Sequence, residues 1–113
     1  MVYNNMSTQI FNKPIPIIIL SDFLNSCCQR HNGFVFDTIS YRKAEYTNNI
    51  ISFIKLCQDY YYPSKQKYVD EKSYTYKSIT TIIRQICNYH KIPYITNVVY
   101  NHSAYNTVYT IHI

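Results

Sequence analysis

Glycine is almost absent from this chain, with one residue, Gly33, in 113. A single glycine excludes a glycine-rich loop of the kind that holds phosphate groups in nucleotide-binding proteins. It also means that asparagine, aspartate, serine and proline must make the tight turns. Tryptophan is missing, whereas tyrosine occurs 14 times. Because A/T-rich codons favour tyrosine together with isoleucine, asparagine and lysine, we attribute part of this excess to coding composition.

Acidic residues are few, and they end early in the chain. All six lie before residue 72, whereas the segment 73–113 carries Lys77, Arg84 and Lys91 and no acid. The net charge of +5 is compatible with an anionic partner. Six scattered carboxylates form no paired-carboxylate motif, so an enzyme is the least supported class. We therefore expect a non-enzymatic protein without a cofactor.

Long hydrophobic runs are also missing. The apolar run at residues 15–20 is too short to span a membrane and is interrupted by Pro16, and no secretory leader precedes it. We expect an intracellular protein that does not bind membranes and keeps its four cysteines as free thiols.

The composition that remains is that of a folded domain. Hydrophobic residues make up 47% of the chain and charged residues only 15%, unlike disordered segments. A chain of this length can bury roughly 65% of the surface that its unfolded form exposes. We expect a loose N-terminal arm at residues 1–11 and a single domain at residues 12–113.

Hydrophobic periodicity predicts three helices. The first is expected from Ser21 or Asp22 to about Arg30, after an edge strand or extended lead-in at residues 12–19, and Asn32 and Gly33 should end it. The second spans about 41–61 and is ended by Pro63. The third spans 76–91, with a buried stripe of isoleucines. These isoleucines are Ile79, Ile82, Ile83 and Ile86.

Two regions have the pattern of strands. Residues 34–40 form a short β-prone run, and a shorter strand is an option at residues 66–69. The C-terminal segment predicts a hairpin around a four-residue loop at 101–104, in which Tyr100 faces Tyr105 and Tyr94 faces Ile111. The order helix, strand, helix, helix, hairpin is that of a winged-helix domain. We therefore predict an α+β, winged-helix-like fold with a small antiparallel sheet.

The third helix carries a polar stripe opposite its isoleucines. Lysine and arginine can neutralise phosphates, and arginine and asparagine can read base edges, so the stripe is a candidate nucleic-acid surface. An ordinary solvated helix face explains the same pattern, and the helix dipole alone favours a cation near the C-terminal end. The stripe consists of Lys77, Thr81, Arg84, Asn88 and Lys91.

A second candidate surface is the segment YYYPSKQKYV, residues 60–69. Here tyrosines alternate with Lys65 and Lys67, as in proteins that stack single-stranded bases and hold the backbone. The alternative is that the tyrosines cover the end of the second helix while the lysines solubilise a loop.

Cysteine and histidine residues are spaced in a way that permits a metal site. Cys27 and His31 are four apart on the first helix, and Cys87 and His90 are three apart on the third. Two such pairs could supply the four ligands of a tetrahedral zinc site, but they lack the C-x2-C motif. Cysteines on apolar helix faces usually act as small hydrophobic residues. A Cys57–His90 nucleophile pair can be drawn, but nothing selects it. We predict no metal site.

The segments YYYPSKQKYV and YTYKSITTIIRQICNYHKIPY, followed by the tyrosine-rich hairpin, resemble small proteins encoded by giant DNA viruses of the mimivirus kind. The resemblance covers residues 60–113 and implies action in the host cytoplasm or the virion. It carries over no functional residue. The sequence favours a non-enzymatic nucleic-acid-binding module that uses the basic side of the third helix, with the hairpin tip at residues 101–103 or the segment with Lys65 and Lys67 adding backbone contacts. The alternative is a protein-interaction or virion structural module. In that alternative, a homodimer would use Tyr100, Tyr105 and Tyr109 as anchors.

Overall fold

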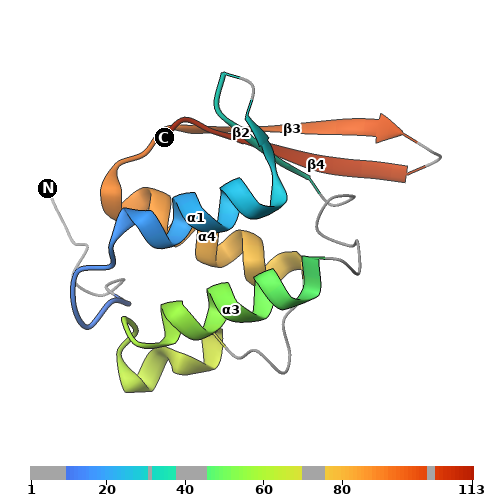
Figure 1. Ribbon diagram of the computed structural model, residues 1–113. Helices are drawn as coiled ribbons and strands as arrows, with labels where there is room; N and C mark the ends of the chain where they lie inside the picture. Colours follow the sequence, from blue (N-terminus) through green and yellow to red (C-terminus); the bar gives the residue numbers. More distant parts are fainter. Residues whose placement is uncertain (1–9, 31, 38–45, 70–75, 102–103) are drawn as a thin grey trace, which may run out of the picture.

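The computed structural model describes residues 10–30, 32–37, 46–69, 76–101 and 104–113. A sheet lies on one side of the molecule and the helices on the other, and of the three α-helices α3 is furthest from the sheet (Figure 1). The predicted α+β class, three α-helices and C-terminal hairpin are confirmed, whereas a winged-helix arrangement stays a prediction. The elements are α1 (Ile17–Cys27), β1 (Gln29–Arg30), β2 (Phe34–Asp37), α3 (Thr47–Gln58), the 3-10 helix η3 (Pro63–Tyr68), α4 (Tyr76–His90), β3 (Tyr94–Asn101) and β4 (Ala104–Ile111).

Helix α1 begins a turn earlier than predicted. Pro16 stands at its N-terminal boundary with an extended backbone, and its fixed φ suits the entry into a helix. Ser21 does not cap the helix, because its hydroxyl donates to the carbonyl of Ile18 at 3.2 Å. The helix ends at Cys27, so Asn32 and Gly33 do not terminate it. The early start adds Ile19 to the buried face.

The lead-in to α1, residues 12–16, belongs to no strand, since residues 12 and 13 form a bend and Pro16 has an extended backbone. Phe11, which the sequence assigned to the loose arm, is buried and forms an isolated bridge with Tyr61. Its ring meets that of Tyr61 edge-on at 5.1 Å. Residues 1–9 of the predicted arm lie outside the described residues.

Helices α3 and α4 confirm the predicted periodicity. The buried residues of α3 include Phe53, which stacks on Phe23 of α1 with ring centroids 4.2 Å apart. The four isoleucines of α4 are all buried, as predicted. The strand considered at residues 66–69 is not formed, because Pro63 begins the 3-10 helix η3, which runs to Tyr68. Gln58 Nε2 donates to the carbonyl of Val69, just after this helix, at 2.6 Å.

The sheet has the order β1-β2-β4-β3, and all its strands are antiparallel. The predicted hairpin register is confirmed, including Tyr100 opposite Tyr105 and Tyr94 opposite Ile111. The predicted loop is too long, since Asn101 already pairs with Ala104. Strand β4 is therefore central, and β3 forms the edge of the sheet in the part of the chain that is described.

Gly33 sits in the turn between β1 and β2. Its φ is +124°, where side chains are strained, and a Cβ would lie 3.0 Å from the carbonyl oxygen of Ile111. The one glycine in the chain is therefore used where the backbone of β4 approaches a turn.

We expect Gly33→Ala to lower the free energy of unfolding by about 1–3 kcal/mol, through backbone strain and the close approach to Ile111. The matched control is Asn32→Gly, since Asn32 already has a φ of +55° that glycine adopts without strain. The control should be neutral or slightly stabilising in urea unfolding. Equal stability of both variants would contradict the prediction.

Candidate functional site

Arg84 does not point freely into solvent. Its Nη1 donates to the hydroxyl of Tyr109 on β4 at 3.0 Å, and its Nη2 lies 3.4 Å from Thr81 Oγ1. Arg84 and Thr81 are half-buried, and Tyr109 is buried. The guanidinium therefore links α4 to the sheet.

This link divides the polar stripe that the sequence predicted on the third helix. Asn88 and Lys91 are exposed at the C-terminal end of α4, whereas Thr81 and Arg84 are half-buried nearer the middle of the helix. Lys91 has a φ of +57°, the left-handed conformation common just after a helix. The backbone of Lys77 lies in α4, but its side chain is outside the described set. The described part of the stripe thus offers two exposed side chains at one end.

We expect Tyr109→Phe and Arg84→Met each to reduce the free energy of unfolding, Tyr109→Phe by about 1 kcal/mol, because each removes a half-buried, charge-assisted hydrogen bond. The free energy of unfolding of the double variant should fall by less than the sum of the two single losses, with a coupling of about 0.5–1.5 kcal/mol in urea unfolding. Additive losses would show that this bond does not stabilise the fold. The exposed Asn88→Ala is the control and should cost less than about 0.5 kcal/mol.

The second predicted surface is also partly structural. Tyr61 is buried, and its hydroxyl donates to Gln85 Oε1 of α4 at 2.5 Å. The ring of Tyr60 lies 5.3 Å beneath Lys13 Nζ. Lys65 is half-buried and Lys67 exposed on η3. Among the side chains described in this segment, one lysine and one tyrosine, Lys67 and Tyr62, are exposed.

The cysteine thiols are not set up as nucleophiles. All four are free, and Cys27, Cys57 and Cys87 are buried. Burial raises the pKa of Cys57 to about 12 and that of Cys87 to about 11. These thiols are protonated at neutral pH, whereas catalysis requires a thiolate.

The histidine that shares a helix with Cys87 has a structural contact. His90 Nε2 lies 2.5 Å from the carbonyl oxygen of Ile15, so it ties the end of α4 to the lead-in of α1. His31 falls outside the described residues. Among those described, no group of three or more histidine, cysteine or acidic side chains could hold a metal ion.

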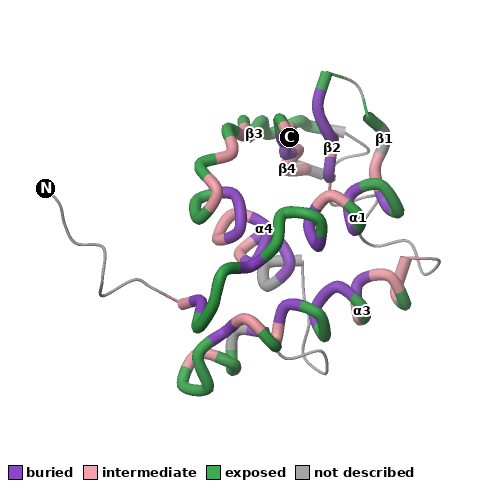
Figure 2. The backbone as a smooth tube through the Cα atoms, turned by 60° about the vertical axis from the view of Figure 1, so that its left-hand side comes forward, coloured by how far each residue is buried: buried purple, intermediate pink, exposed green. Residues whose placement is uncertain are grey.

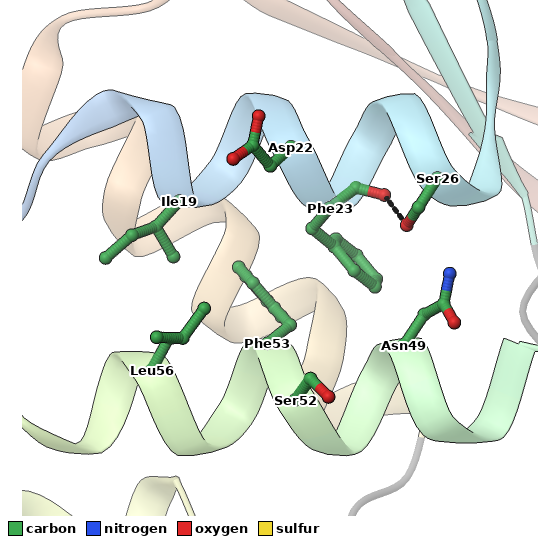
Figure 3. Close-up of a pocket in the computed structure, with 8 residues that line it drawn as sticks. All are labelled: Ile19, Asp22, Phe23, Ser26, Asn49, Ser52, Phe53 and Leu56. Carbon is green, nitrogen blue, oxygen red and sulfur yellow. Dashed lines mark hydrogen bonds between the residues drawn. The ribbon is translucent and has the colours of Figure 1, made fainter.

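A shallow hollow of about 250 Å³ lies between α1 and α3 (Figure 3). The stacked Phe23 and Phe53 form its floor with Ile19 and Leu56, and Asp22 is its single ionisable group. A lone carboxylate above an apolar floor provides no acid–base pair. The other polar side chains lining the hollow are Ser26, Asn49 and Ser52.

The outer part of the C-terminal hairpin is the most exposed apolar feature among the described residues. Every residue from 95 to 100 is exposed, on both faces of the sheet. The hairpin runs past the ends of the helices (Figure 1), and β3 is coloured as exposed over most of its length (Figure 2). No charged residue follows Lys91 in the sequence. We name Ile95, Val98, Val99, Tyr100 and Tyr105 the hairpin surface.

Two tyrosines dominate this surface. Tyr100 and Tyr105 are 64% and 76% exposed, and their ring centroids are 4.9 Å apart. Tyr109, the third expected anchor, is only 5% exposed and bonds Arg84 instead. The sequence had not singled out Ile95, Val98 and Val99. The available signal was the 22-residue stretch after Lys91, which mixes β-branched and aromatic residues without any charge.

No helix in the described ranges is long and apolar enough to cross a membrane. Comparison of the chain with protein-family models, with curated proteins and with solved structures finds no match.

Proposed function

We propose that this chain is a non-enzymatic protein-interaction module that binds its partner through the hairpin surface. The observation that carries the proposal is the exposure of Val98, Tyr100 and Tyr105 at 67%, 64% and 76% on a strand pair without charge. Contiguous exposed apolar groups on a folded domain are typical of interaction sites.

The chemistry of this surface suits a protein partner. Tyrosine is enriched at protein interfaces because it brings a large apolar area and a hydroxyl with few rotatable bonds, whereas charged residues are depleted at their centres. A nucleic acid would need cations beside the rings, and the two strands of the hairpin contain none.

A photo-reactive benzoylphenylalanine in place of Tyr105 tests this proposal. After irradiation of the purified protein and of cell extracts that contain it, we expect a discrete protein adduct that persists at high salt, because apolar contacts are not screened. Tyr100→Lys should reduce its yield at least fivefold, whereas Tyr62→Lys, at an exposed tyrosine outside the hairpin, should not.

The same label at Asn25, an exposed position on α1, is the control and should give no such adduct. The proposal fails if Tyr105 gives no protein adduct. It also fails if the adduct contains nucleic acid and its yield falls steeply with salt.

A second candidate function is nucleic-acid binding at the end of α4. It is supported by exposed Asn88 and Lys91, by exposed Lys67 on η3 and by the absence of acids after residue 72. Arg84 contributes less to this candidate than the sequence predicted, because its guanidinium bonds Tyr109.

A salt titration with duplex and single-stranded DNA and RNA tests this second function. If the site binds phosphates, log affinity should fall linearly with log salt, and Lys91→Ala should reduce the slope by about one. Lys13→Ala, at an exposed lysine that stacks on Tyr60, is the charge-matched control and should leave the slope unchanged. No binding at low salt would eliminate this candidate.

A further inference from the structure

The two edges of the sheet are built differently. Strand β1 at one edge has two residues, one of them Arg30, whose guanidinium bonds the carbonyl of Ile113 at 3.2 Å. Strand β3 at the other edge has eight residues and contains no charge and no proline. Proteins normally protect edge strands by shortness, charge, proline or a covering element. Within the described residues, β1 has two of these protections and β3 has none.

The backbone of β3 presents hydrogen-bonding groups along this open edge. His112 N donates to the carbonyl of Pro93 at 3.0 Å, which places that pair among the hydrogen-bonded pairs of the hairpin. Because such pairs alternate in an antiparallel ladder, the odd-numbered residues of β3 bond β4. The N–H and C=O groups of the even-numbered residues therefore face outward. These residues are Tyr94, Thr96, Val98 and Tyr100.

We propose that a second copy of this chain pairs with the β3 edge, antiparallel, about a two-fold axis at Asn97. This inference rests on the proposed function and names its partner. A register centred on Asn97 places Tyr94 opposite Tyr100 of the other copy and Thr96 opposite Val98. All four outward-facing residues then form hydrogen-bonded pairs. In any other two-fold register, at least one of them has no partner within β3 of the other copy.

The side chains are self-complementary in this register. On the face turned away from the helices, Ile95 meets Val99 of the other copy, and these two side chains are 55% and 43% exposed in the single chain. Asn97 meets its own copy, so the two amides can bond each other across the axis. Because β3 carries no charge, the two-fold brings no like charges together along the strand, which would otherwise oppose self-pairing.

Disulfide trapping tests the register. Asn97 faces itself in a non-hydrogen-bonded pair, where Cα atoms lie about 4.5 Å apart, a separation that a disulfide spans. We expect Asn97→Cys to form a covalent dimer under mild oxidation. Val99→Cys is the matched control on the same face, and it should cross-link at least tenfold more slowly because it lies opposite Ile95. Equal rates, or no cross-link in a protein that sediments as a dimer, would overturn the register.

Blocking the edge tests the pairing itself. Val98→Pro removes an N–H that points away from β4, so the hairpin should persist while the dimer dissociates in sedimentation. Asn97→Lys places two cations face to face at the axis and should weaken association at least tenfold, with Asn97→Ser as its uncharged control. Unchanged circular dichroism verifies folding. A wild-type chain that stays monomeric at high concentration would overturn the inference.

These outcomes separate the inference from the proposed function. A monomeric chain whose Tyr105 label captures a different protein would refute self-pairing and leave the interaction module in place. A monomeric chain without any protein adduct at Tyr105 would refute both.

Discussion

The burial of α4 is the constraint on which the rest of this structure depends. Its isoleucine stripe is fully enclosed, and three flanking side chains bond three other segments. Arg84 reaches Tyr109 on β4, Gln85 accepts from Tyr61 after α3, and His90 contacts the carbonyl of Ile15 before α1. Because these side chains already contact other segments, α4 cannot act as a freely presented recognition helix along its whole length. The hairpin that comes after it extends beyond the helical layer.

Local patterns predicted the elements whose hydrophobic period is long and regular. The spacing of Ile50, Phe53 and Cys57 identified α3, and the pairing of Tyr100 with Tyr105 fixed the hairpin register. The start of α1 was missed because two prolines suggested an extended chain up to Ile19, although a proline at the entry of a helix is favourable. The preference for extended backbone applies to the residue before a proline and leaves the residues after the last proline free to begin a helix.

The candidate site was harder to predict, because exposure depends on what lies over each element. A helical wheel placed Arg84 opposite the isoleucines but could not show that Tyr109 would cover its flank. Similarly, alternation placed Tyr109 and Tyr105 on one face of β4, yet the first is 5% exposed and the second 76%. The difference is set by how far the helices extend beneath the hairpin, which is tertiary information (Figure 1).

The unequal edges of the sheet also determine how large an assembly can become. A sheet with two long open edges can add copies without limit, as fibrils do. Here, pairing through β3 would leave two β1 edges outermost, each two residues long and carrying Arg30. A two-residue strand is too short to pair with a further strand, so the assembly would stop at two copies. Strand β1 would then act as a terminator that separates finite self-association from polymerisation.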